Sequence, residues 1–296
     1  MNLLKGLKGR VRRDLPLKRY TTFKIGGRAR FFVEPKDQDD LKILLGLAKK
    51  YRIPVAVIGA GSNILAGDRG IKGIVVKLSS PYFNKLSVKG NCIEAGSGVW
   101  IGRLLSFSRK CGLSGLEFLA GIPATVGGAL AMNAGITKER RSIGNIVKSV
   151  TVMDKKGNRK VLKRKSIKFS YRNSSLSKYI ILSALLNLKK GDRARIGDEI
   201  RGHLKYRSLT QDLSGPCAGC VFKNPAGDSA GRLIDLCGLK GKRSGGAGVS
   251  LKHANFILNL GGASFTDVIR LMDIIKRKVK NRFKIELVPE ITIWRS

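Results

Sequence analysis

The segment from Gly121 to Gly135, GIPATVGGALAMNAG, constrains the fold of this chain more than any other. It is rich in glycine, contains Pro123 and carries no charged side chain, so it does not read as an amphipathic helix. Glycine is used where the backbone takes unusual dihedral angles or approaches a ligand closely. A second such segment, Gly59–Gly70, follows the apolar run Val55–Ile58. Both are typical of loops whose N–H groups face phosphate, with tight core turns as the alternative.

Length and hydropathy indicate a globular protein. A chain of 296 residues favours two or three domains, and 43% hydrophobic residues is an ordinary globular content. No stretch is apolar over the length that a membrane-spanning helix requires. The first residues, MNLLKGLKGRVRRDLP, carry charge where a signal peptide has an apolar run. We therefore expect a cytoplasmic protein without membrane insertion.

The charge is strongly basic, with 58 Lys and Arg against 20 Asp and Glu, or +38. Residues 151–210 alone hold 17 basic and 4 acidic side chains. Nucleic-acid binding is one interpretation. However, the basic residues are spread along the chain and are not interleaved with aromatic residues. We favour a solvated basic surface that steers anionic ligands, with only non-specific, salt-sensitive binding to nucleic acid.

The five cysteines are scattered and do not form a disulfide framework. Cys217 and Cys220 form a CxxC pair, a spacing that suggests a zinc site or redox chemistry. Structural zinc requires four ligands, and the only histidines are His203 and His253, with no second CxxC. The sequence therefore predicts no metal site.

Apolar periodicity predicts a mixture of helices and strands without a regular βαβ alternation, which indicates an α+β protein. The predicted helices are 37–51, Val99–Cys111, Ala194–Arg207, Ser229–Cys237 and Phe265–Asn281. The predicted strands are Val55–Ile58, Ile74–Leu78, Leu86–Lys89, Cys92–Ala95, Ile146–Asp154, Arg159–Leu162, Ile180–Leu188, Asn255–Leu260 and Phe283–Leu287. A more charged region begins near residue 192, where we expect a domain boundary.

Common nucleotide motifs are absent. Gly59-Ala-Gly61 has Ile64 where a dinucleotide fingerprint requires its third glycine. Gly96-Ser-Gly98 has its next glycine one residue late, at Gly102, and we interpret it as a strand-to-helix turn. No GxxxxGK[ST] sequence exists, which excludes a P-loop.

Seven motifs in a fixed order nevertheless form a known set. They are TFKIGG at 22–27, GAGSN at 59–63, GIPATVGG at 121–128 with Asn133 and Gly135, Tyr171-Arg172, GCVFKNP at 219–225, HANF at 253–256 and LVPE at 287–290. From about residue 20 to residue 293 the chain resembles the UDP-N-acetylenolpyruvoylglucosamine reductases (UDP-N-acetylmuramate dehydrogenases), in their shorter type II form. The resemblance implies a flavoenzyme in which NADPH reduces FAD and hydride then passes to the enolpyruvyl group of a UDP-sugar, for peptidoglycan precursor synthesis.

The resemblance also implies a domain plan: an FAD-binding (PCMH-type) region of two subdomains, residues 1–80 and 81–191, and a smaller α+β substrate-binding domain, residues 192–296. Backbone amides of both glycine loops would wrap the FAD pyrophosphate. The cofactor-binding residues implied are Gly59, Ala60, Gly61, Ser62, Asn63, Ile64, Leu65, Gly121, Ile122, Pro123, Thr125, Gly127, Gly128, Asn133 and Gly135.

Three catalytic residues are expected. Hydride addition leaves enolate-like charge, which the Arg172 guanidinium is suited to stabilise and which Glu290 would polarise. An acid must then protonate the carbon. The family usually has serine at the position of Cys220, and a thiol is intrinsically the better acid. We predict that Cys220 donates the proton and that Cys217 is incidental.

The remaining expectations concern ligands and partners. Tyr171, Lys223, Asn224 and His253 are predicted to contact the substrate, a UDP-sugar enolpyruvyl ether. We expect a monomer. A related oxidase with covalently attached FAD is the rival enzyme, but Gly59–Gly70 contains no histidine or cysteine for the attachment.

Overall fold

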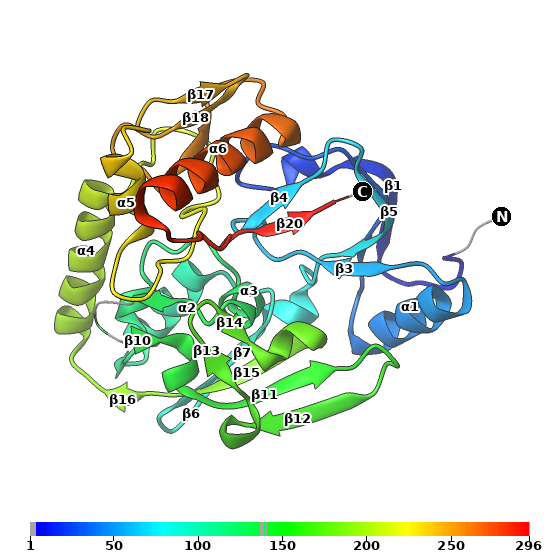
Figure 1. The fold of residues 1–296 in the computed structure, drawn as a ribbon. Helices are drawn as coiled ribbons and strands as arrows, with labels where there is room; N and C mark the ends of the chain where they lie inside the picture. Colours follow the sequence, from blue (N-terminus) through cyan, green and yellow to red (C-terminus); the bar gives the residue numbers. More distant parts are fainter. Residues whose placement is uncertain (1–3, 137–138, 140, 296) are drawn as a thin grey trace. The chain divides into compact units, whose positions relative to one another are not determined.

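The computed structural model describes residues 4–136, 139 and 141–295, and the chain divides into two compact units (Figure 1). The first unit comprises Met1–Arg13, Phe31–Gly59 and Gly73–Arg207. The second unit comprises Asp14–Arg30, Ala60–Lys72 and Ser208–Ser296. Neither unit is continuous in sequence, and each is described by itself.

An antiparallel five-stranded sheet is the centre of the first unit. Its strand order is β12 (Arg159–Lys163), β11 (Val147–Met153), β15 (Ile180–Asn187), β7 (Cys92–Gly96) and β6 (Leu86–Lys89). Strands β6, β7, β11 and β12 confirm four strands predicted from the sequence, and they pair as the hairpins β6–β7 and β11–β12. Side chains alternate across a strand, so one face of the sheet can be apolar while the other stays polar. Val150 and Ala184 pair across the apolar face.

Helices α2 (Ile101–Lys110) and α3 (Val126–Ala131) contribute to the core on that apolar face. Ile101, Leu104 and Leu105 of α2 are buried, at the spacing of one helix face. The turn between β7 and α2 contains Gly96-Ser-Gly98 and confirms the predicted strand-to-helix turn.

Helix α1 (Gln38–Lys50) belongs to a second core of the first unit. The Asp37 carboxylate caps it by accepting hydrogen bonds from the Asp39 and Asp40 amides at 3.1 and 2.9 Å. Leu41 and Leu44 pack with Val33 and Ile74. These last two lie in a four-stranded sheet of order β1 (Arg10–Pro16), β2 (Arg28–Glu34), β5 (Ile71–Val76) and β3 (Val55–Val57).

Short elements complete the first unit. The paired strands are β8 (Leu113–Ser114) with β16 (Lys189–Lys190), β9 (Gly135–Ile136) with β10 (Arg141–Ser142), and β13 (Phe169–Ser170) with β14 (Asn173–Ser174). The 3-10 helices are η2 (Pro81–Asn84), η3 (Glu117–Leu119), η4 (Ile143–Asn145), η5 (Arg164–Ser166) and η6 (Ser175–Lys178). Helix α4 (Arg193–Thr210) confirms the helix predicted at Ala194–Arg207 and carries the chain out of this unit.

The second unit packs helices on small sheets. Strands β17 (Arg243–Ser244), β18 (Ala247–Val249) and β19 (Ile257–Asn259) form one antiparallel sheet, and β4 (Ile64–Ala66) pairs in parallel with β20 (Thr292–Trp294). The other elements are η1 (Leu17–Arg19), α5 (Ala230–Leu236) and α6 (Phe265–Phe283). A capping box of Ser264 and Asp267 begins α6.

One predicted strand is wrong. Helix α6 continues to Phe283, its C-cap Lys284 has φ +60°, and residues 284–288 form no strand. The alternation of Phe283, Ile285 and Leu287 resembled a strand, but Phe283 continues the apolar face of the helix. The combination of antiparallel sheets and separate helices is α+β, as predicted. Across the described ranges, no helix combines the length and apolar character needed to cross a membrane.

Candidate active site

The first glycine loop leaves a run of backbone amides open. Among the residues that the structure describes, the N–H groups of Gly59, Ala60, Gly61 and Ser62 have no acceptor. Polar N–H groups that the fold does not pair are available to a ligand. This is the arrangement expected of a backbone that binds an anion.

Close packing explains the glycine at position 61. Gly61 has φ +69°, and a Cβ there would lie 2.0 Å from the Tyr20 carbonyl oxygen. The Thr22 amide donates to the Gly61 carbonyl at 3.2 Å. Beyond the loop, Ile64 and Leu65 enter β4 and are buried, so they support the loop from the core.

The second glycine loop makes more of its own hydrogen bonds. The Val126 and Gly127 amides donate to the carbonyls of Val99 and Ser97 at 2.8 and 2.9 Å. Thr125 caps α3 and accepts from the Gly128 amide at 3.3 Å. The sequence suggested that this whole loop would offer its amides to phosphate, but these three are already engaged. Their contact with a cofactor stays a prediction, as it does for Gly121, Ile122 and Pro123.

Within the first unit, Gly59 at the start of the first glycine loop lies beside Thr125 of the second. A Cβ on Gly59 would lie 2.6 Å from Thr125 Oγ1. With glycine at position 59, the Thr125 hydroxyl can come this close, whereas a side chain there would require Thr125 to move. The structure thus brings together the ends of two segments that are far apart in the sequence.

Arg172 lies at the tip of the β13–β14 hairpin, beside the end of the second loop. Its φ is +51°, an unusual conformation for a residue with a side chain. Its Nη1 donates to the Gly135 carbonyl at 3.1 Å, and its guanidinium lies 5.4 Å from the centre of the Tyr171 ring. Backbone strain of this kind is concentrated at functional sites.

Asn133 fixes the hairpin that carries Arg172. This residue is buried and has φ +44°. Its Nδ2 donates to the Ser170 carbonyl at 2.9 Å, and its Oδ1 accepts from the Gly144 amide at 3.1 Å. These bonds position the hairpin, and the contact of Asn133 with a cofactor stays a prediction.

Cys220 and Glu290 lie on neighbouring segments of the second unit. The Glu290 amide donates to the carbonyl of Val221, the residue after Cys220, at 2.8 Å. Phe222 and Pro289 also pair, and Cys220 itself pairs with Phe256. Both Cys220 and Glu290 are half-buried. Arg172 belongs to the other unit, so its approach to these two residues stays a prediction.

Asn63 connects the first glycine loop to the same place. Its Nδ2 donates to the Glu290 carbonyl at 3.2 Å, and its own carbonyl accepts from the Thr292 amide at 2.8 Å. A predicted cofactor residue is thereby fixed beside a predicted catalytic residue within the second unit.

Cys217 is half-buried like Cys220, and its incidental role stays a prediction. Burial raises the pKa of the Cys217 thiol, so it stays protonated and weakly nucleophilic. Its carbonyl accepts a hydrogen bond from Thr22 Oγ1 at 2.6 Å.

Three of the predicted substrate residues, Lys223, Asn224 and His253, belong to the same unit as Cys220, whereas Tyr171 belongs to the first unit. The Lys223 amide donates to the Val288 carbonyl at 2.8 Å, and Asn224 Oδ1 accepts from the Ala230 amide at 3.0 Å. The His253 ring lies 4.7 Å from the Phe256 ring, and its Nδ1 accepts from the Asn255 amide at 3.2 Å. Burial lowers the pKa of His253, which favours the neutral ring.

Sequence reasoning missed Asn255. Its Oδ1 accepts from the Phe222 amide at 2.9 Å, and its Nδ2 donates to the Phe222 carbonyl at 2.8 Å. Asn255 therefore fixes the segment that follows Cys220. The signal was available, because Asn255 lies in the quoted HANF motif, but only His253 was selected from it. Within the described part of the chain, no three or more His, Cys, Asp or Glu residues group to hold a metal.

Comparison with known proteins identifies two domain families in the chain. Residues 29–163 match the FAD binding domain family, and residues 210–294 match the C-terminal domain of UDP-N-acetylenolpyruvoylglucosamine reductase. UDP-N-acetylenolpyruvoylglucosamine reductase 2 of Symbiobacterium thermophilum is 42% identical over 288 residues, which are 97% of this chain and 92% of that protein. The Bacillus subtilis reductase is 40% identical, over 96% of this chain and 94% of that protein.

A solved structure extends the likeness to three dimensions. The UDP-N-acetylenolpyruvylglucosamine reductase of Thermus caldophilus superimposes with a TM-score of 0.82 at 35% identity, covering 98% of this chain and all of that one. Sequence and structure agree over nearly the whole length. The chain therefore belongs to the UDP-N-acetylenolpyruvoylglucosamine reductase family and is an FAD-containing oxidoreductase.

Proposed function

We propose that the protein reduces the enolpyruvyl ether of UDP-N-acetylglucosamine to UDP-N-acetylmuramate, a precursor of peptidoglycan. NADPH would be the reductant and FAD the carrier between the two substrates. The names of the relatives support the substrate, and the matched FAD-binding family supports the carrier. We further propose that the reaction takes place in the cytoplasm and that the enzyme acts as a monomer.

The first glycine loop fits FAD. The open amides of Gly59, Ala60, Gly61 and Ser62 suit a diphosphate, because four consecutive donors can meet several anionic oxygens. When bound, FAD accepts hydride from one substrate and delivers it to the other.

The chain's own residues would manage charge and protons. Hydride addition to the terminal carbon of the enolpyruvyl group leaves negative charge on the neighbouring carbon and its carboxylate. The Arg172 guanidinium would stabilise this charge, and Glu290 would polarise the developing enol. The Cys220 thiol would then give its proton to the carbon that bears the ether oxygen. The resulting thiolate would recover a proton from water.

The backbone hydrogen bond between Glu290 and Val221 carries this proposal. It ties a carboxylate residue to the residue beside a thiol, although the two are about seventy positions apart in the sequence. Cys220 and Glu290 thus share one local framework, which suits two groups that must act on a single substrate carbon.

The test is spectroscopic and uses the purified protein. We expect a yellow preparation whose visible flavin absorbance is bleached by NADPH without air and restored by adding the enolpyruvyl substrate. Mass spectrometry should then detect a product two hydrogens heavier than the substrate. A colourless protein that binds no added FAD would contradict the flavin assignment. Bleaching without recovery would contradict the substrate.

A further inference from the structure

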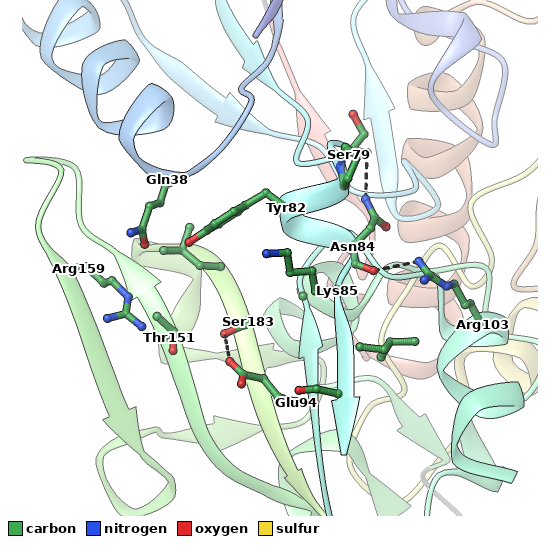
Figure 2. A pocket seen from close by; sticks show the side chains of 15 residues that line it. Gln38, Ser79, Tyr82, Asn84, Lys85, Glu94, Arg103, Thr151, Arg159 and Ser183 are labelled. Atoms are coloured by element: carbon green, nitrogen blue, oxygen red, sulfur yellow. Dashed lines mark hydrogen bonds between the residues drawn. The ribbon is translucent and has the colours of Figure 1, made fainter. Parts of the chain in front are cut away.

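A second cavity lies in the first unit, with a volume of about 900 Å³ (Figure 2). This volume is in the range of sites that bind small organic molecules. None of the residues lining it belongs to either glycine loop or to the proposed catalytic groups. The cavity is therefore not accounted for by the proposed reaction.

The floor of the cavity is the outer face of the five-stranded sheet. Thr151 pairs with Ser183, and Ser183 pairs with Gly96, so these three form a row across β11, β15 and β7. Glu94, also on β7, accepts a hydrogen bond from Ser183 Oγ at 3.2 Å. Figure 2 shows Thr151, Ser183 and Glu94 along this floor. Leu86 and Leu182 line the cavity as well, so this face of the sheet carries both polar and apolar side chains.

Helix η2 forms the wall of the cavity. Gly96 has no side chain, and a Cβ there would lie 2.2 Å from the Phe83 carbonyl, so only glycine lets η2 approach the sheet. Tyr82 of η2 is 37% exposed. The Lys85 ammonium lies 5.3 Å from the centre of its ring. Burial raises the pKa of the Tyr82 phenol, which therefore stays a hydrogen-bond donor.

Three cations line the cavity against a single carboxylate, that of Glu94. Lys85, Arg103 and Arg159 make no ion pair with any residue in the described ranges. Arg103 donates to the Asn84 carbonyl at 2.9 Å, which orients its guanidinium. Unneutralised cations that converge on a cavity attract an anion and form charge-assisted hydrogen bonds with phosphate.

We propose that this cavity binds a nucleoside phosphate. Each part of such a ligand has a suitable partner here. Arg159 and Lys85 suit the phosphates, and the exposed Tyr82 ring suits the base, because aromatic side chains stack on bases. Glu94 suits the ribose, since a carboxylate accepts hydrogen bonds from ribose hydroxyls. The charge of Glu94 would disfavour binding of a simple phosphate, so its presence favours a ligand that also carries hydroxyl groups.

The test measures ADP and inorganic pyrophosphate binding by calorimetry. The protein is loaded with FAD beforehand, at an ionic strength of about 0.15 M. We expect one ADP per chain in this cavity. Arg159→Ala should lower the affinity for both ligands about tenfold or more, because loss of one charge-assisted hydrogen bond has an effect of this size. Glu94→Gln should lower the affinity for ADP but not for pyrophosphate, because only ADP has a ribose.

Two controls make the result specific. Lys163→Ala removes a cation from the same strand, β12, outside the cavity, and should leave both affinities unchanged. Lys85→Ala is a second test variant, and thermal unfolding checks that each variant is folded. Equal losses in Arg159→Ala and Lys163→Ala would overturn the proposal in favour of general attraction to a basic surface. Absence of ADP binding, or ADP binding that Glu94→Gln leaves unchanged, would also overturn it.

Discussion

At the scale of single residues, the two cysteines of the CxxC pair are both half-buried but have different partners. Cys220 is half-buried and lies on the segment that pairs with Glu290, whereas burial raises the pKa of Cys217. The CxxC spacing suggested zinc or redox chemistry, but we predicted no metal site and a role for Cys220 alone. The environments differ because the carbonyl of Cys217 is bonded to Thr22 while Cys220 pairs with Phe256.

The first prediction concerns Cys220. Cys220→Ala should slow the reoxidation of reduced flavin by the enolpyruvyl substrate about 100-fold or more, because general acid catalysis contributes at least that much. The reduction of flavin by NADPH should stay unchanged, since it needs no proton from this residue. Rapid-mixing absorbance measures each half-reaction separately. Cys220→Ser should recover part of the rate, and Cys217→Ser is the control. Wild-type reoxidation in Cys220→Ala would refute the assignment.

The second prediction concerns Gly61. Gly61→Ala should abolish tight FAD binding, because the new Cβ would lie 2.0 Å from the Tyr20 carbonyl and φ is +69°. Gly102→Ala is the matched control, since a Cβ there meets no atom within 4 Å in helix α2. It should bind FAD normally and stabilise the protein slightly. Flavin fluorescence titration measures both variants. Equal FAD affinity in the two would contradict the role of the loop.

At the scale of elements, buried asparagines position the segments that carry the predicted catalytic residues. Asn133 joins the β13–β14 hairpin to the chain near Gly144, and Asn255 joins its own loop to Phe222. An amide both donates and accepts, so one side chain can satisfy two backbone groups that no regular element pairs. Neither helix nor sheet periodicity identifies such residues.

The third prediction concerns Asn255. Asn255→Ala should lower the free energy of unfolding by about 1–3 kcal/mol, because it leaves buried backbone groups of Phe222 unpaired. It should also slow substrate reduction more than flavin reduction, since the segment after Cys220 loses its anchor. Urea unfolding and the two half-reactions provide the readouts. Asn158→Ala, at an exposed turn, is the control. Unchanged stability in Asn255→Ala would contradict the positioning role.

At the scale of the whole molecule, charge and protonation dominate the response to solution conditions. With a net charge of +38, only a minority of the Lys and Arg side chains can form an ion pair with a carboxylate. The others must be solvated or bind an anionic ligand. Asp212 is an example of a carboxylate that is well hydrogen-bonded. Ser214 and Ser250 donate to Asp212, and these bonds lower its pKa.

The fourth prediction concerns pH. Burial lowers the pKa of His253, so the unfolded chain takes up this proton more readily than the folded protein. The neutral His253 ring therefore contributes fully to stability above its pKa in the unfolded chain, about 6.5. This contribution is lost as the pH falls toward its lower pKa in the folded protein. The lowered pKa of Asp212 adds a loss of the same sign below about pH 4. Urea midpoints across this range measure both steps. His253→Gln should remove only the upper one, and an unchanged upper step would contradict the assignment.

The fifth prediction concerns nucleic acid. A surface whose basic residues are spread along the chain should bind DNA without sequence preference. The affinity should fall at least tenfold between about 50 and 200 mM salt, because binding releases counterions. Fluorescence anisotropy with two unrelated duplexes measures this. A strong preference for one duplex that persists at high salt would show a specific site instead.

The sequence by itself determined the α+β class, most helices and hairpins, and the family. The reason is that apolar periodicity and glycine placement are local properties, and seven ordered motifs are specific. Some local patterns gave a wrong prediction. Apolar and polar residues alternate over Phe283–Leu287 as in a strand, but Phe283 belongs to the apolar face of helix α6.

Only the tertiary structure decided which predicted residues meet. It joined Glu290 to Val221, Arg172 to Gly135 and Gly59 to Thr125, through pairings between segments far apart in the chain. It also determined which amides stay open, since those of Val126 and Gly127 bond to distant carbonyls while those of Gly59–Ser62 do not. The assignment of residues to FAD and the subdomain boundaries at 80 and 191 stay predictions. The physical reason is that hydrogen bonding and burial depend on contacts with residues far away in the chain, which the local sequence does not identify.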